Sequence, residues 1–268
     1  MQKGFKGLWA WGVCGLLLLV ARNDALAAPP AAVEKPVAVV LKREIPRSAL
    51  RPRESERQAR RATLSPEDYA LWESNSEMQA LQELLLGPLL QAYIERKGLV
   101  PAKQDIEAAV AGLSSGTKAL RQQLEAERDR LRAELGRVDL SPEQRRSLQA
   151  SQESTERALR GQSEDDAALG AAALKELEDE VAREMVLSWM VQRSLHREFG
   201  GDIIFQQVGA EAVGAYLPFL EQRQKAGDFK LLDKDVSRRF WAHVRRAPGI
   251  RMPQDALETP WWLMTPKP

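Results

Sequence analysis

The strongest constraint on the fold is the stretch Glu83–Gly112. Leucines, alanine and tyrosine recur at helical spacing up to Glu95-Arg96-Lys97, whose cations suit the negative end of a helix dipole. Gly98 follows, and glycine commonly ends a helix by adopting the left-handed conformation. After Val100-Pro101 a second apolar series begins, again at helical spacing. The stretch therefore predicts two helices joined by a tight turn.

Composition favours helices over the rest of the chain. Hydrophobic residues make up 44% of the 268 positions, but aromatics only 6%, and Val, Ile and Thr are sparse. We therefore expect a mostly α fold, with a multi-helix body, a short two-stranded β element and a projecting helical hairpin. The net charge of +1 gives no general reason to expect nucleic acid or an anionic membrane as a partner.

The N-terminus has the three parts of a secretory signal peptide. Lys3 and Lys6 precede an apolar run from Leu8 to Ala21, and Ala25-Leu26-Ala27 fits the small-residue cleavage motif. The apolar run is shorter than the roughly 20 residues that span a bilayer comfortably. We expect residues 1–27 to be removed during export to the periplasm, with no integral membrane span afterwards. An uncleaved anchor is the alternative.

The cysteine and histidine content argues against several kinds of chemistry. Cys14, the only cysteine, lies inside the apolar run, so the mature chain would have no disulfide, no reactive thiolate and no cysteine-bound metal. His196 and His243 are interpreted as surface or packing residues, with a pH-sensitive contact as the alternative. A nucleophile elbow, a P-loop and a dinucleotide-binding fingerprint are absent from the sequence. We expect no catalysis, no cofactor and no metal.

Two runs of charge allow more than one interpretation. Residues 42–61 contain eight cations and three anions, which indicates either a site for acidic lipid or polypeptide or a solvated arm. The acids between Glu176 and Glu180 indicate either an acid–base pair or a solvated helix face. We favour the solvated interpretation for both runs.

Start and stop signals divide the mature chain into four segments. Residues 28–116 contain a strand-like run, Val37–Leu41, and a helix start at Ser65-Pro66. A second helix start is expected at Ser76, and a kink or break at Gly87-Pro88.

Residues 117–160 predict an antiparallel helical hairpin, because a thin leucine stripe runs along mostly polar sequence. Ser141 begins its second helix with a capping box, and a pair of ordinary surface helices is the alternative. Residues 161–247 predict C-terminal helices that complete the body. They begin with a polar break at Gly161–Asp166 and contain a strand candidate, Asp202–Gln207, to pair with Val37–Leu41. A last helix is capped by Asp233. Residues 248–268 form an irregular tail.

Two motifs carry a resemblance to a known family. Val40–Leu50 stands where a strand and turn of the form V-N-G-x-x-I-T-x-S-x-L would lie, although Asn-Gly is absent. Glu95–Pro101 and Asp105-Ile106 follow a leucine-rich helix and stand where the family has the pattern K-x-G-[IL]-x-V-[ST]-x-x-[ED]-[VI], from which Pro101 departs. The first half of the mature chain thus resembles the N-terminal domain of SurA-type periplasmic chaperones, which are linked to parvulin isomerase domains. No parvulin domain is recognisable here.

The resemblance implies a chaperone body without the isomerase, which holds unfolded or extended polypeptide clients by apolar contacts between helices. The candidate client-contacting residues are Tyr69, Trp72, Tyr93, Trp261 and Trp262, since Trp and Tyr provide rigid contact area; core packing is the alternative for each. A second hypothesis is a structural or adaptor subunit that binds one specific cell-envelope protein. A third is a degenerate relative of the peptidyl-prolyl isomerases, against which the missing domain argues.

Overall fold

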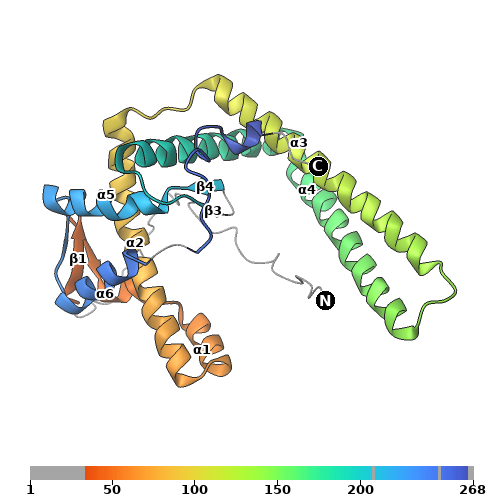
Figure 1. Cartoon of the computed structure of the whole chain (residues 1–268), viewed down its shortest axis with the longest axis horizontal. Coiled ribbons are helices and arrows are strands. Elements are labelled where there is room, and N and C mark those ends of the chain that lie inside the picture. The colour runs from red at the N-terminus through yellow and green to blue at the C-terminus, as the bar shows by residue number, and fades with distance from the viewer. Residues whose placement is uncertain (1–33, 207–208, 247–248, 265–268) are drawn as a thin grey trace. The chain divides into compact units, whose positions relative to one another are not determined.

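The computed structural model describes residues 34–206, 209–246 and 249–264, and for 162–171 it describes the backbone. The predicted signal peptide lies outside the described residues. The fold is mostly α with a short β element, as the sequence predicts (Figure 1). The chain divides into two compact units, which are treated separately below. Unit 1 falls within Met1–Ala92, Phe205–Gly209 and Tyr216–Gly249, and unit 2 within Tyr93–Ile204, Ala210–Ala215 and Ile250–Pro268.

Unit 1 contains a three-stranded antiparallel sheet in the order β2-β1-β5. The central strand β1 (Pro36–Val40) pairs with β2 (Arg43–Pro46) on one side and with β5 (Phe229–Leu231) on the other. The predicted strand Val37–Leu41 is therefore present as β1, the central strand of this sheet. The expected pairing of Asp202–Gln207 with β1 is wrong, because β2 and β5 already occupy both edges of β1.

The helices of unit 1 begin at the residues that the capping signals indicate. The Ser65 hydroxyl accepts the backbone N–H of Asp68 at 3.1 Å where α2 (Pro66–Lys97) begins. The Asp233 carboxylate accepts two backbone N–H groups, at 2.8 and 3.0 Å, where α6 (Lys234–Val244) begins. A 3-10 helix, η1 (Arg47–Leu50), and α1 (Glu54–Thr63) precede α2.

The separate helix at Ser76 is wrong, since α2 is continuous there. Of the kink or break expected at Gly87-Pro88, the continuous helix excludes the break, and the kink stays a prediction. Proline inside a helix costs about 3 kcal/mol or more. The buried leucines Leu81, Leu85 and Leu89 lie on either side of Pro88. Burying each contributes roughly 1.5–3 kcal/mol, so together they outweigh the cost of the proline.

One part of the core of unit 1 lies between its sheet and α6. Val40, Phe229 and Phe240 are buried, and the rings of Phe240 and Trp241 meet edge to face at 5.2 Å. Arg239 of α6 donates to the Ser74 hydroxyl and the Glu77 carboxylate of α2, at 3.2 and 3.0 Å. Polar contacts thus connect α6 to α2 at the edge of the apolar core.

Unit 2 is organised around two long antiparallel helices, α3 (Lys103–Leu135) and α4 (Pro142–Phe199), which lie side by side (Figure 1). The predicted capping box is present: Ser141 Oγ accepts the Gln144 N–H, and the Gln144 side chain accepts the Ser141 N–H. Within 117–160, where every residue is described, Leu131 is the only buried hydrophobic side chain. The hairpin is therefore held by a thin apolar seam, as its sequence predicts.

The polar break expected at Gly161–Asp166 is wrong, since α4 passes through it as one helix. Polar residues do not end a helix unless they offer the backbone competing hydrogen bonds or adopt a non-helical conformation. Gly98 (φ 62°) does end a helix, as expected, and Gly200 (φ 66°) follows the last residue of α4. At Gly98 the backbone N–H groups of Leu99 and Gly98 reach the carbonyls of Ile94 and Glu95, which is a Schellman motif.

The remaining elements are short. Two strands, β3 (Ile204–Gln206) and β4 (Gly209–Glu211), follow α4, and α5 (Val213–Ala226) continues through Pro218. The described part of the tail ends with a 3-10 helix, η2 (Trp261–Leu263). The Trp262 ring packs with Ala109 of α3 and with Ala182 and Val186 of α4 to form a core cluster of unit 2.

Candidate polypeptide-binding site

Unit 1 contains an open groove of about 630 Å³ on one face of α2. A groove of this size falls in the range that holds small ligands and short segments of chain. Its walls come from η1 and the segment after it, from α1, from α2 and from α6. The lining residues are Leu50, Arg51, Pro52, Glu56, Asn75, Ser76, Gln79, Ala80, Glu83 and His243.

The groove is a polar surface because of the spacing of five residues along α2. Positions 75, 76, 79, 80 and 83 recur at helical intervals, so their side chains share one face of the helix. Asn75 and Gln79 offer an amide oxygen and an NH₂ group, and Ser76 offers a hydroxyl that both donates and accepts. These are the groups that complement the N–H and C=O groups of an extended peptide backbone.

His243 contributes an imidazole that burial holds in its neutral form. Its Nδ1 atom is buried and has no hydrogen-bond partner among the described residues. Desolvation by burial, and then the positive charge of Arg246, hold the pKa of His243 below its usual value. The Arg246 guanidinium donates to Asn75 Oδ1 at 2.9 Å. The groove therefore contains the neutral imidazole of His243, whose Nδ1 has no hydrogen-bond partner among the described residues. It also contains the side-chain amide of Asn75, which the hydrogen bond from Arg246 holds in place.

Tyr69 and Trp72, two of the predicted contact residues, lie together on α2 but do not line the groove. Their ring centroids are 5.6 Å apart, and each ring is approached by an arginine of α1. The guanidinium of Arg60 lies 5.8 Å from the Trp72 ring, and that of Arg61 lies 5.1 Å from the Tyr69 ring. Both aromatic rings are half-buried in this junction between α1 and α2.

Tyr93 lies in unit 2, where only 1% of its surface is exposed. Its hydroxyl lies 2.7 Å from Ser194 Oγ and donates to the Glu198 carboxylate at 2.9 Å. Lys97 pairs with the same carboxylate at 2.9 Å. Burial raises the pKa of Tyr93, so the phenol stays protonated. In this structure Tyr93 is a core residue and presents no surface to a client.

Trp261 and Trp262 form one aromatic cluster with Trp189 in unit 2. The Trp262 ring lies 5.9 Å from Trp189 and 5.8 Å from Trp261, edge to face in both cases. Trp262 is buried, whereas Trp261 is 36% exposed and is followed by the exposed side chains of Leu263 and Met264. Of the two predicted contact residues in the tail, Trp261 is the one that a partner can reach.

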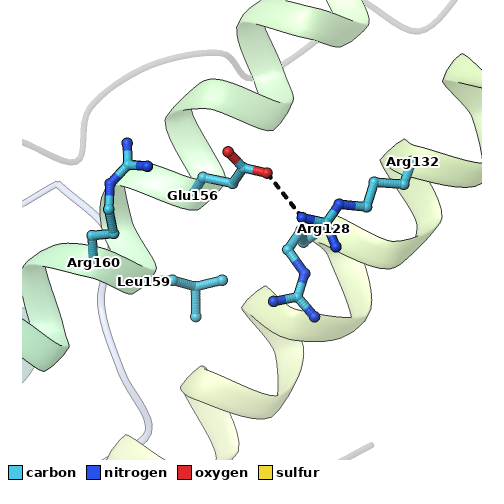
Figure 2. A pocket seen from close by; sticks show the side chains of 5 residues that line it. All are labelled: Arg128, Arg132, Glu156, Leu159 and Arg160. Atoms are coloured by element: carbon cyan, nitrogen blue, oxygen red, sulfur yellow. Dashed lines mark hydrogen bonds and ion pairs between the residues drawn. The ribbon is translucent and has the colours of Figure 1, made fainter.

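A second, smaller pocket of about 290 Å³ crosses the α3–α4 hairpin (Figure 2). It is lined by Arg128 and Arg132 of α3 and by Glu156, Leu159 and Arg160 of α4. Arg132 and Glu156 form an ion pair across the two helices at 3.3 Å. In Figure 2 the Leu159 side chain lies between Arg160 and Arg128. This pocket combines positive charge with a small apolar floor.

The groove residues were not predicted from the sequence. A signal was present, because Asn75, Ser76 and Gln79 are uncharged polar residues on a helix whose other face is rich in leucine. Arg51 lies in the basic run 42–61, and a pH-sensitive contact was one interpretation of His243, but only the tertiary fold brings the two to α2.

Comparison with known proteins does not assign this site to a family: no family model matches the chain, and no curated protein or solved structure does. Within the described residues, no group of three or more His, Cys, Asp or Glu is placed to hold a metal ion. The helices in the described ranges also include none with the length and apolar character needed to cross a membrane.

Proposed function

We propose that this protein is exported to the periplasm and acts there, without catalysis, as a chaperone-like protein that holds unfolded or extended polypeptides. The observation that carries the proposal is the groove of unit 1. An extended chain carries unpaired backbone N–H and C=O groups at every residue, whatever its sequence. Amide and hydroxyl side chains along α2 satisfy such groups without selecting particular client side chains.

The groove also offers apolar contact beside these polar groups. Leu50, Pro52 and Ala80 line it, and Arg51, Glu56 and Glu83 supply charges of both signs. A mixed lining of this kind accepts varied client side chains, which a single deep apolar pocket would not. The resemblance of the N-terminal half to SurA-type chaperones supports the same function.

An adaptor subunit that binds one specific envelope protein is the second candidate. The exposed tail residues Trp261, Leu263 and Met264 favour it, because exposed apolar residues that cluster on a surface commonly mark a docking site for one partner. The breadth of clients separates the two functions. A chaperone acts on unrelated unfolded chains, whereas an adaptor binds its one partner and leaves the others to aggregate.

The first experiment measures aggregation of an unfolded outer-membrane protein and of an unrelated unfolded soluble protein, each with and without the purified chain. Suppression of both at near-stoichiometric amounts is expected. If the chain suppresses the aggregation of neither protein, the holding function is ruled out.

Site-specific photocrosslinking then locates the client. A photoreactive amino acid at Gln79, inside the groove, is expected to crosslink both clients. The same amino acid at Ala70, which is exposed on α2 outside the groove, is the matched control and is expected to crosslink neither. If aggregation is suppressed but both positions crosslink equally, the protein still holds clients, but the client-binding site is not the groove.

A further inference from the structure

The tail of unit 2 lies along α4 as an irregular segment of polypeptide. Its described part, 249–264, contains no helix other than the short η2. Near the end of α4, Gln254 Oε1 lies 3.0 Å from His196 Nε2. Further back along the helix, Trp262 packs in one cluster with Ala182. The tail therefore runs antiparallel to α4, in the way that a bound non-helical peptide could.

The surface under the tail is apolar and adaptable. Ala109 of α3 and Val186 of α4 are buried in the cluster with Trp262, and the partly buried Met185 and Met190 pack against it. Methionine side chains are flexible, and they are common at surfaces that bind varied partners. Without the tail this cluster would be an exposed apolar patch, which is the kind of surface that marks an interaction site.

Two side chains anchor the tail to this surface. Leu257 and Trp262 are the buried side chains of the described tail, at 1% and 8% exposure. The Trp189 indole N–H donates to the backbone carbonyl of Leu257 at 3.1 Å, a contact that any residue at this position can make. Trp262 lies against Gly112, whose missing side chain leaves the space for it. The surface thus takes one large apolar residue and one aromatic residue.

The charged contact between these anchors leaves donors unused. Arg193 and Arg197 both donate to the same oxygen of Glu258, Oε2, at 3.0 and 2.7 Å. Guanidinium and carboxylate groups commonly form two parallel hydrogen bonds instead. The Arg193 Nε atom is buried and has no hydrogen-bond partner among the described residues. The tail is therefore an incomplete match for the two arginines, and another carboxylate can replace Glu258.

The tail also has few contacts that would prevent it from opening. The side chains of Glu258 and Arg197 are 51% and 55% exposed, so their ion pair contributes little to stability. Segments with few buried apolar contacts open locally more readily than the core of a protein. Release of the tail is therefore a small change that leaves α3 and α4 in place.

We propose that the α3–α4 surface under the tail is a second binding surface for unfolded polypeptide, which clients occupy by displacing the tail. Its ligand is a non-helical segment with the pattern of Leu257, Glu258 and Trp262: a large apolar residue, an acid directly after it, and an aromatic residue four positions after the acid. The inference rests on the proposed function, since the groove of unit 1 takes the same class of ligand. A seated tail competes with the client and raises the apparent Kd.

The test measures the Kd of a fluorescent peptide for the full chain by anisotropy. The peptide has the same pattern of apolar, acidic and aromatic residues in an otherwise unrelated sequence, and a peptide of scrambled order is the control. Trp262→Ala removes one anchor of the tail and is expected to lower the Kd of the patterned peptide roughly tenfold or more relative to the unmodified chain. The scrambled peptide is expected to bind weakly to both chains.

Glu258→Ala is a second way to weaken the tail. It changes an exposed side chain and leaves both anchors buried, so it tests the proposal even if Trp262→Ala fails to fold. A decrease in Kd of roughly threefold is expected, because an exposed ion pair is lost. Adding Arg193→Ala and Arg197→Ala is expected to remove that gain, since the acid of the peptide then has no partner. Circular dichroism checks that every variant keeps its helices.

Asp255→Ala/Thr259→Ala is the matched control, because both residues are exposed in the tail. It is expected to bind the patterned peptide like the unmodified chain. An equal Kd for the unmodified chain, Trp262→Ala and Glu258→Ala overturns the proposal, and so does equal binding of the scrambled peptide. A dimer in light scattering that Trp262→Ala converts to a monomer also overturns it, because the surface would then hold the tail of a second copy.

The aggregation assay separates this proposal from the proposed function. A chain that suppresses aggregation but shows no gain in peptide binding when the tail is weakened keeps the holding function and loses the second surface. A chain that gains peptide binding but suppresses the aggregation of neither protein has the surface and loses the holding function.

Discussion

Trp262 lies so close to Gly112 that a Cβ on that glycine would stand 2.8 Å from both the Cβ and the carbonyl oxygen of Trp262. Gly116, about one turn further along α3, has no atom within 4 Å of its Cβ position. The two glycines of one helix therefore differ in a single respect, which is whether the tail packs over them.

Gly112→Ala is expected to displace Trp262 and to lower the free energy of unfolding by about 1–3 kcal/mol, the usual cost of overfilling a packed site. Gly116→Ala is expected to raise it by roughly 0.5–1 kcal/mol, because alanine is the better helix former. Urea unfolding followed by tryptophan fluorescence measures both. Stabilisation by both substitutions would show that the tail does not depend on close contact with α3.

Tyr93→Phe is expected to lower the free energy of unfolding by about 1–2 kcal/mol, because it removes hydrogen bonds to Ser194 and Glu198 from a buried position. Tyr69→Phe is the control, since that hydroxyl is half-buried at the surface junction with Arg57. Its expected effect is within about 0.5 kcal/mol. Chemical unfolding compares the two variants, and equal losses would contradict the core role of Tyr93.

Ala80→Trp is expected to fill the groove of unit 1 and to raise the Kd of a fluorescent extended peptide roughly tenfold or more, a loss of about 1.4 kcal/mol. Fluorescence anisotropy measures the Kd. Ala70→Trp adds the same side chain to an exposed position of α2 outside the groove and is expected to leave the Kd unchanged. Unchanged binding in both variants would place the peptide elsewhere.

His243 is expected to make the stability of unit 1 depend on pH. The unfolded chain binds a proton at this ring near pH 6.5, while burial and Arg246 lower the pKa in the folded chain. Between those two values the unfolded state binds more protons. The contribution of His243 to the free energy of unfolding is therefore complete above about pH 6.5 and is lost as the pH falls through the pKa of His243 in the folded chain. His243→Gln should thus lose less stability than the unmodified chain between about pH 7.5 and pH 5.5 in urea unfolding.

The sequence predicted the ends of helices better than their continuity. Ser65, Ser141 and Asp233 cap their helices, and Gly98 ends one, through contacts within a few residues, so local sequence contains the necessary information. The supposed breaks at Ser76 and Gly161 were wrong because a capping residue or a polar run also fits inside a helix. Burial of leucines around Pro88 is a tertiary effect that local sequence does not reveal.

The sequence did not predict the third strand or the groove, because both depend on contacts between segments that are distant in the sequence. Phe229-Lys230-Leu231 is too short to show strand periodicity, and it becomes β5 because β1 offers a free edge. The groove combines Arg51, Gln79 and His243, which are distant in sequence. Aromatic content indicated Tyr69, Trp72, Tyr93, Trp261 and Trp262 instead, because residue type alone cannot separate a buried ring from an exposed one.

The pairing of β1 with β5 also sets the order in which the chain can fold. Val40 and Phe229 are opposite each other in the sheet, although about 190 positions separate them. Closing so large a loop has an entropic cost and slows the formation of the contacts that depend on it. The α3–α4 hairpin needs only a short turn and can form early. In a chain that emerges N-terminus first, the α3–α4 hairpin can therefore form before the sheet is complete, and β1 gains its second neighbour only after synthesis has passed Leu231.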